Sequence, residues 1–303
     1  MKIAGGVIGS IMLCWIFASW YLSGLFLTLG IVDFDVGKEQ ELIDGFGIPN
    51  LAQQPVAISV NNVTLHGTFF HQSKATCAVI LLPGIGGDRT QVLPALPLFW
   101  NFGCHVLAYD PRGTGASQGP LRTFASLEKQ DNAEVIRWLV EQTDLNKTQI
   151  GIWGPSFGAA VALMTLDEVD PVGFVIADST FSSLDRVLKD TLAILIHPFV
   201  AELITPGVIL FLQWRLDMNV ADVRPDVSIV GVETPVLLIH ALEDPAMNVN
   251  HSRDVFRSRT NDNVKLKVSD WGAGHADSAI VDPVAYEILV REFLQANKFG
   301  QLP

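Results

Sequence analysis

The sequence has few charged residues and few cysteines for its length. Only 17% of its 303 residues are Asp, Glu, Lys or Arg, against roughly 25% in an ordinary soluble domain. The 20 Lys and Arg residues are outnumbered by 32 Asp and Glu residues, which gives a formal charge of −12. We expect no nucleic-acid partner, because a polyanion is bound through a basic surface that releases its counterions. The three cysteines are too few for a disulfide scaffold.

Motifs that bind metals or phosphates are missing as well. The Cys and His residues lack the spacing of a zinc site, so we expect no metal. The glycine-rich segment Pro83–Arg89 contains neither G-x-G-x-x-G nor G-K-[ST], which disfavours a phosphate-binding loop. The sequence therefore offers no motif for a metal ion or for a phosphate group.

Hydrophobic residues, in contrast, are abundant and unevenly distributed. They make up 49% of the chain, too many for a disordered protein. The run Ile3–Val32 contains no Asp, Glu, Lys, Arg or His, and about 20 apolar residues are enough to span a bilayer. The run is too long for the apolar region of a cleaved signal peptide, and no A-x-A-like cleavage site ends it. We therefore predict a retained signal anchor over residues 1–32.

The charges beside this run predict its orientation. Lys2 and the terminal amine precede it, whereas residues 33–44 are rich in acidic side chains. Because positive charge stays on the cytoplasmic side, we expect a single-pass anchor with the bulk of the chain extracytoplasmic. Residues 33–55, which include Gly45, Gly47 and Pro49, are expected to form an irregular linker.

Short apolar runs that alternate with helix-period stretches predict the fold of residues 56–298. The expected strands are 56–60, 63–70, 77–82, 105–109, 150–153, 173–177, 235–240 and 264–268, and the expected helices are 89–101, 124–143, 157–168, 251–260 and 282–297. Asn61-Asn62 is a plausible tight turn, so the first two strands should form an antiparallel hairpin. The later runs are continuously apolar, as in buried parallel strands. This α/β pattern predicts a mostly parallel sheet of about eight strands with helices on both faces.

Residues 181–233 interrupt the alternation between the sixth and seventh strands. The segment Leu192–Leu212 is mostly apolar but contains Pro198, Pro206 and Gly207, which disfavours a continuous transmembrane helix. We predict a helical cap over the sheet, and a pair of core helices is the alternative.

Gly154-Pro155-Ser156-Phe157-Gly158 is the strongest chemical signal in the chain. It matches G-x-S-x-G, follows an expected strand and opens a helix rich in small residues. In that context the serine occupies a sharp strand-to-helix turn, and Gly154 and Gly158 let the neighbouring elements pack closely. Ser156 is therefore the predicted nucleophile, against the alternative of a Gly-Ser turn without chemistry.

A serine hydroxyl needs a general base, and the base needs an acid to orient it. His275 lies in a glycine-flanked loop after the last strand, so we predict that it is the base. Asp244 follows the seventh strand and is the favoured acid, with Glu243 and Asp270 as competitors. The other histidines are expected to be packing or surface residues.

Two backbone amides are expected to stabilise the oxyanion that forms during acyl transfer. One belongs to Phe157, directly after the nucleophile. The other should come from the loop after the third strand, in which Gly84 lets the backbone approach closely and Ile85 is the expected donor.

Two further residue pairs are of interest beside the sheet. Asp110 and Arg112, in the loop after the fourth strand, are expected to pair with each other and shape that loop. Cys77 and Cys104 lie near the starts of two neighbouring strands. Poor bridging geometry between adjacent parallel strands favours free thiols, although an extracytoplasmic domain leaves a disulfide open.

These motifs resemble those of the α/β-hydrolase superfamily over roughly residues 55–298, and most closely its membrane-anchored lysophospholipase and serine-aminopeptidase-like branch. The matching positions are Asp110, Arg112, Gly113, Gly115, Ser117 and Gly119 of the D-x-R-G-x-G-x-S-x-G loop, Gly154, Ser156 and Gly158 of the elbow, His240 and Asp244 of the H-G-x-x-D turn, and His275 of the base loop. The sequence departs from the branch at Pro83, where a histidine is usual, and at Ala241, where a glycine is usual. The resemblance implies an eight-stranded sheet, a cap after the sixth strand and cofactor-free hydrolysis of an ester, thioester or amide.

The leading interpretation is a membrane-anchored serine hydrolase that cleaves an acyl ester through a Ser-His-Asp triad and an acyl-enzyme. The apolar cap and the anchor suggest a small acyl substrate that is lipid-like. One alternative is an aminopeptidase-type amide hydrolase. Another is a catalytically inactive hydrolase fold that serves as a binding module, although the complete set of Ser156, Asp244 and His275 argues against it.

Overall fold

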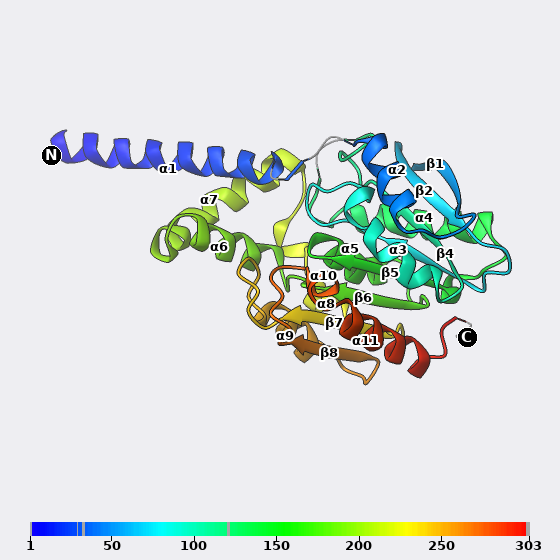
Figure 1. Cartoon of the computed structure of the whole chain (residues 1–303). Coiled ribbons are helices and arrows are strands. Elements are labelled where there is room, and N and C mark those ends of the chain that lie inside the picture. The colour runs from blue at the N-terminus through cyan, green and yellow to red at the C-terminus, as the bar shows by residue number, and fades with distance from the viewer. Residues whose placement is uncertain (1, 29, 32–33, 120–121, 301–303) are drawn as a thin grey trace.

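Eight strands form one sheet at the centre of the molecule (Figure 1). The computed structural model describes residues 2–28, 30–31, 34–119 and 122–300. In the sheet order β1-β2-β4-β3-β5-β6-β7-β8, β2 is antiparallel to β1 and β4, and all other neighbours are parallel. The strands are β1 (Ala52–Val60), β2 (Val63–His71), β3 (Cys77–Leu81), β4 (Cys104–Tyr109), β5 (Ile150–Pro155), β6 (Phe174–Asp178), β7 (Val236–Ala241) and β8 (Val264–Ser269). The predicted sheet is thus confirmed, including its first hairpin.

Helices cover both faces of this sheet. The helices are α1 (Lys2–Thr28), α2 (Val36–Gly45), α3 (Leu96–Trp100), α4 (Glu128–Gln142), α5 (Phe157–Met164), α6 (Leu184–Leu195), α7 (Pro198–Leu216), α8 (Pro225–Ser228), α9 (Asn250–Ser258), α10 (Ser278–Val281) and α11 (Pro283–Ala296). Side chains of α4, α5 and α9 join the core on one face, and those of α2, α3 and α11 join the core on the other. Strands β3 to β7 are buried along their length, which explains their continuous apolar sequences.

The structure differs from the sequence-based prediction in residues 33–55. The expected irregular linker contains helix α2, and β1 begins at Ala52 rather than at residue 56. Asp35 caps α2, because its side chain accepts hydrogen bonds from the amides of Gly37 and Lys38. The predicted boundary between anchor and linker, at residues 32–33, and the first residue of the anchor lie outside the described residues. Residues 36–45 are therefore a folded element and not part of a tether.

The expected helix over residues 89–101 is broken into two 3-10 turns and the short helix α3. Pro94 and Pro97 lie in this segment, and each is the second residue of one of these elements. A proline can begin a helix but cannot donate the amide that would continue one, so the segment folds as a series of short turns.

The cap over residues 181–233 consists of α6, α7, a 3-10 turn and α8. As expected, Leu192–Leu212 is not one helix, because α6 ends at Leu195 and α7 begins at Pro198. From there on α7 is continuous, with Pro206 inside it. Helices α1 and α7 are each long and apolar enough to cross a membrane, over Gly9–Thr28 and Pro198–Leu216. The two helices pack along each other and project together from the body (Figure 1).

Cys77 and Cys104 form a disulfide, so the prediction of two free thiols is wrong. The two cysteines are directly paired in the register between β3 and β4, with their Cα atoms 4.5 Å apart. This spacing is at the short end of the range that a disulfide can bridge. The bond therefore joins adjacent parallel strands that the sheet already holds together.

Candidate active site

Ser156 occupies a strained turn between β5 and α5. Its φ of 52° and ψ of −114° lie in a region that residues with a Cβ rarely adopt. The turn is held by the Ser156 amide, which donates to the carbonyl oxygen of Asp178 at 2.7 Å. A methyl group at Gly158 would collide with the carbonyl of Leu82, and one at Gly154 would collide with the backbone of Gly158. The two glycines of the motif are thus required by close backbone packing around the serine.

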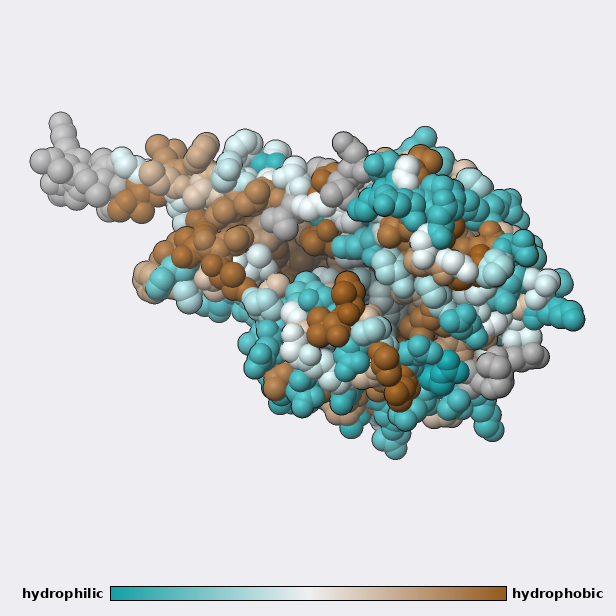
Figure 2. Space-filling view, in the orientation of Figure 1, coloured by the Kyte–Doolittle hydropathy of each residue, from teal (hydrophilic) through white to brown (hydrophobic). Residues whose placement is uncertain are grey.

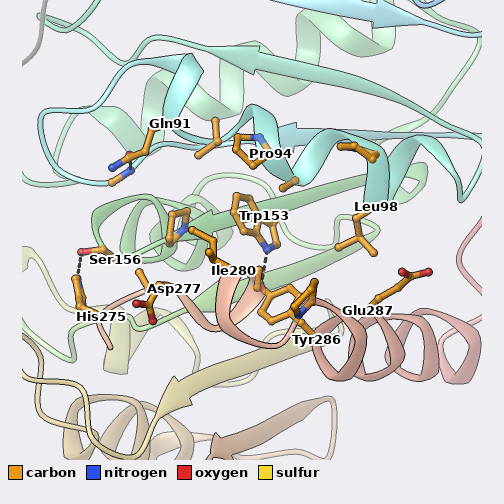
Figure 3. Close-up of a pocket in the computed structure, with 18 of the residues that line it drawn as sticks. Gln91, Pro94, Leu98, Trp153, Ser156, His275, Asp277, Ile280, Tyr286 and Glu287 are labelled. Carbon is orange, nitrogen blue, oxygen red and sulfur yellow. Dashed lines mark hydrogen bonds between the residues drawn. The ribbon is translucent and has the colours of Figure 1, made fainter. Parts of the chain in front are cut away.

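Ser156, His275 and Asp244 form a continuous hydrogen-bonded series. Nε2 of His275 lies 2.8 Å from Oγ of Ser156 (Figure 3). Its Nδ1 lies 2.7 Å from Oδ2 of Asp244. A carboxylate only accepts, so Nδ1 carries the proton and Nε2 is left to accept from the serine hydroxyl. The structure therefore brings together the three residues that the sequence singled out, in the protonation pattern that a general base needs.

Asp244 is held as a carboxylate by its neighbours. Its side chain is fully buried, and burial works against its charge, but hydrogen bonds from His240 and His275 outweigh burial and hold the pKa of Asp244 well below its ordinary value. The amides of Ala246 and Met247 also donate to its Oδ1, at 2.8 Å each. The competing acids Glu243 and Asp270 are exposed and make no hydrogen bond to His275.

His240, which we expected to be a packing or surface residue, positions Asp244. Its Nε2 donates to the carbonyl of Met247 at 2.9 Å and lies 3.4 Å from Oδ2 of Asp244, and its Nδ1 accepts from the hydroxyl of Ser252 at 2.7 Å. Both ring nitrogens of the imidazole thus make hydrogen bonds, and these hold the turn that carries Asp244. Its position four residues before Asp244 was the only sequence signal for this role.

The loop after β3 and the start of α5 each leave one backbone amide free near Ser156. The side chain of Gln91 accepts from the amide of Gly84 at 2.6 Å, and the carbonyl of Gly84 accepts from the amide of Gly87 at 3.1 Å. Between them, the amide of Ile85 donates to none of the described residues, and the same holds for the amide of Phe157 at the start of α5. Gln91 is therefore a shaping residue of this loop that the motif analysis missed.

Arg89 anchors the far end of the same loop. Its buried guanidinium donates to Asp110 at 2.5 Å and to Glu39 of α2 at 2.9 Å, and it stacks on the ring of Phe34 at 3.6 Å. Glu39 is held in turn by the hydroxyl of Thr68 at 2.6 Å. Phe34 and helix α2 are thereby tied to the loop after β3.

The predicted ion pair between Asp110 and Arg112 is wrong. Asp110 pairs with Arg89, and Arg112 donates to both carboxylate oxygens of Asp131 in α4, at 2.6 Å each. A planar guanidinium binds a carboxylate best through two parallel hydrogen bonds, and Asp131 offers that geometry. Both residues still shape the loop after β4, as expected, but through partners on other elements.

A cavity of about 500 Å³ opens beside Ser156 and His275. Figure 3 shows it between the segment that carries Pro94 and Leu98 and the segment that carries Ile280 and Tyr286. Its walls are mostly apolar. No residue of the cap, 181–233, is among those that line it. The apolar cap therefore does not contribute to this cavity. The sequence-based interpretation, in contrast, had linked the cap to the substrate.

Known proteins share this architecture. The family model of the X-Pro dipeptidyl-peptidases (S15 family) matches residues 54–201. The solved structure of the Pyrococcus furiosus esterase Pf2001 superposes with a TM-score of 0.69 at 24% sequence identity, over 88% of this chain and 98% of that chain. The chain has the α/β-hydrolase fold.

Some relatives match over most of this chain. The uncharacterised protein YqkD of Bacillus subtilis is 29% identical over 71% of this chain and 70% of its own. The uncharacterised membrane protein YNL320W of Saccharomyces cerevisiae is 24% identical over 84% of this chain and 83% of its own. The matches to an esterase structure and to a peptidase family support a hydrolase of this fold.

Proposed function

We propose that this protein is a serine hydrolase that cleaves an acyl ester through Ser156, His275 and Asp244. The observation that carries the proposal is the hydrogen-bonded series from Ser156 through His275 to Asp244, at 2.8 and 2.7 Å. A hydroxyl next to a neutral imidazole, which is itself oriented by a buried carboxylate, is the arrangement that activates a serine.

Acylation uses each member of this series in turn. Nε2 of His275 takes the proton of Ser156 as Oγ attacks the carbonyl carbon of the ester. The carbonyl oxygen becomes an oxyanion, which accepts from the amides of Ile85 and Phe157. The imidazolium, stabilised by Asp244, then gives its proton to the leaving alkoxide. The products are an alcohol and an acyl group bound to Ser156.

Deacylation repeats the same steps with water. His275 takes a proton from a water molecule, whose oxygen attacks the acyl carbon, and the same two amides stabilise the second oxyanion. The imidazolium returns the proton to Oγ of Ser156, which releases the carboxylic acid. No cofactor is needed for either half of the reaction.

The cavity beside Ser156 favours an apolar acyl group. Its wall residues Pro94, Leu98 and Ile280 have no polar side-chain atom, and Trp153 satisfies its own indole N–H by donating to the Tyr286 hydroxyl at 2.9 Å. An apolar acyl group can therefore enter this cavity without leaving the Trp153 N–H, a hydrogen-bond donor, without a partner. We therefore propose that the acyl chain lies in this cavity.

Labelling with a fluorophosphonate probe tests the assignment of the nucleophile. The parent protein should be labelled, and Ser156→Ala and His275→Ala should lose labelling. Ser258→Ala is the matched control, because Ser258 lies on α9 and donates to the carbonyl of Asp254, away from the cavity. Persistent labelling of Ser156→Ala would overturn the proposal.

A peptidase is the second candidate, because the matching family model describes X-Pro dipeptidyl-peptidases. The same triad can cleave an amide if His275 protonates the leaving amine. A panel of fatty-acyl p-nitrophenyl esters and aminoacyl p-nitroanilides separates the two activities. Turnover of the anilides alone would favour the peptidase.

We also propose that α1 anchors the protein in a membrane with the hydrolase body extracytoplasmic. The length and apolarity of Gly9–Thr28 support this, as does the relative named as a membrane protein. The Cys77–Cys104 disulfide supports the orientation, since disulfides persist in oxidising compartments. Protease added outside sealed vesicles of known orientation should cleave the body but not α1.

A further inference from the structure

The apolar surface of the cap is not explained by the cavity at Ser156. Exposed apolar side chains cluster where α6 turns into α7, a set that we call the hairpin tip and that consists of Ile194, Leu195, Ile196, Phe199 and Leu203. Phe199 is 68% exposed and Ile194 is 63% exposed. Figure 2 shows the hydrophobic surface of this region as one of the largest on the visible face. Soluble proteins rarely leave such a patch uncovered.

Helix α1 carries a second exposed apolar surface, and the two are joined by close packing. The indole of Trp15 donates to the carbonyl of Leu203 at 2.9 Å, and Gly207 of α7 packs directly against Ser19. These small residues let the helices approach closely, as in pairs of membrane helices. Farther along both helices, Arg215 donates to the carbonyl of Trp20 at 3.2 Å.

The order of these contacts shows that α1 and α7 run in the same direction. Trp15 meets Leu203, and four residues later on both helices Ser19 meets Gly207. Phe199, one turn before Leu203, therefore lies beside the part of α1 near Ile11, one turn before Trp15. Ile11 is 65% exposed and belongs to the apolar stretch Gly9–Thr28.

From this register we propose that the hairpin tip inserts into the lipid bilayer next to α1, so that the cap is a second membrane contact. The inference rests on the proposed anchoring by α1. If α1 spans a bilayer, a tip at the level of Ile11 can only be surrounded by lipid. A bilayer is the occupant favoured over a soluble partner, because the apolar surfaces of the tip and of the anchor lie side by side on packed helices.

The charges of the hairpin are compatible with this placement. No Asp, Glu, Lys or Arg occurs between Thr191 and Ala201. The nearest charges, Lys189 and Glu202, form an ion pair with each other, which lowers the cost of placing them at membrane depth. The guanidinium of Arg215 stacks on the ring of Trp20 and donates to its carbonyl, and such partners lower the cost of a charge at membrane depth.

A site-specific fluorescent probe tests the insertion in the full chain. Phe199→Cys, in a Cys14→Ser background, is labelled with an NBD dye and reconstituted in phosphatidylcholine vesicles. Cys77 and Cys104 are bonded to each other and do not compete for the dye. Ile288→Cys on α11 is the matched control, an apolar residue that is 51% exposed. We expect doxyl-labelled lipid to quench the dye at position 199 at least about five-fold more strongly than at position 288.

The same preparation separates this inference from the proposed function. Flotation of the chain with vesicles reports the anchor, and fluorophosphonate labelling reports the triad. Flotation with a dye at position 199 that only aqueous iodide quenches would overturn the insertion and leave the anchor standing. Loss of flotation would overturn both. Quenching of the dye by neither agent would indicate a protein contact or a second copy at the tip, which also contradicts insertion.

Activity provides an independent readout. The double variant Phe199→Asp/Leu203→Asp places two charges at the tip, and neither residue lines the cavity at Ser156. We expect kcat/KM to fall about ten-fold for an ester carried in vesicles and to remain unchanged for p-nitrophenyl acetate in water, because only the first substrate depends on docking. An equal loss for both substrates would indicate misfolding and count against the proposal.

Discussion

Asp178 is a buried acid at the end of β6 whose charge destabilises the folded protein. Its backbone carbonyl holds the Ser156 turn, and the hydroxyl of Ser179 donates to its carboxylate at 3.0 Å. Burial outweighs this hydrogen bond and the nearby histidines, and raises the pKa of Asp178 from 3.8 to about 6. Between these two values the native state keeps a proton that the unfolded chain has lost. The free energy of unfolding therefore falls as the pH rises through this window.

Asp178→Asn should remove this loss of stability. Relative to the parent, the variant should gain on the order of 2–3 kcal/mol in free energy of unfolding between pH 4 and pH 7, because it has no charge to bury. Urea unfolding in detergent at the two pH values measures the gain. The control is Asp270→Asn, since Asp270 is exposed. The same difference between variant and parent at both pH values would contradict the assigned shift.

At the scale of elements, α2 acts on the active site through one buried contact. Glu39 is its link to Arg89 and hence to the loop that carries Ile85. Glu39→Gln removes one of the two carboxylates that pair with the buried guanidinium of Arg89, and Asp110 remains as its partner, so we expect a smaller loss than the roughly 3–5 kcal/mol of an unpaired buried charge. We expect kcat to fall more than KM rises, because the Ile85 amide acts on the transition state. Steady-state kinetics with p-nitrophenyl butyrate measures both, and Glu41→Gln on the exposed side of α2 is the control.

The segment that contains α3 should set the length of the acyl chain. Figure 3 places Leu98 at the end of the cavity away from Ser156. Leu98→Trp fills that end, so the preferred p-nitrophenyl ester should shorten by roughly two to four carbons, with a loss of about 0.8 kcal/mol for each methylene excluded. Ile288→Trp on the exposed side of α11 should leave the profile unchanged. An unaltered profile in Leu98→Trp would place the acyl chain elsewhere.

The sequence predicts those elements whose signals are local. The strands follow from apolar runs, and Ser156, His275 and Asp244 follow from short motifs at strand ends. Arg89 and Glu39 are 50 residues apart, and Arg112 and Asp131 are 19 apart, so no local pattern predicts these pairs. The cavity likewise needs the packing of two distant segments against each other. For this reason the sequence predicts the wrong partners for Asp110 and Arg112. It also links the apolar cap to the substrate, although the cap forms a surface separate from the cavity.

Charged and exposed apolar residues lie at opposite ends of the molecule. The formal charge of −12 belongs to the body, because the stretch Ile3–Val32 carries no charged side chain. The exposed apolar residues of α1 and of the hairpin tip lie at the other end (Figure 2). An acidic body is repelled by anionic headgroups, so apolar contact must supply the attraction to a membrane. Membrane binding should therefore depend little on the content of anionic lipid.

The disulfide between Cys77 and Cys104 should make the stability of the whole domain depend on redox conditions. The cysteines are 27 residues apart, and closing a loop of that length in the unfolded chain stabilises the fold by about 3–4 kcal/mol in the chain-entropy model. Cys77→Ala/Cys104→Ala should lose stability of that order in urea unfolding, and dithiothreitol should weaken the parent but not the double variant. Cys14→Ser, which removes the free exposed thiol, should behave like the parent. Maleimide labelling of the unreduced, denatured parent should then modify one cysteine, and modification of all three would show that the bond does not form.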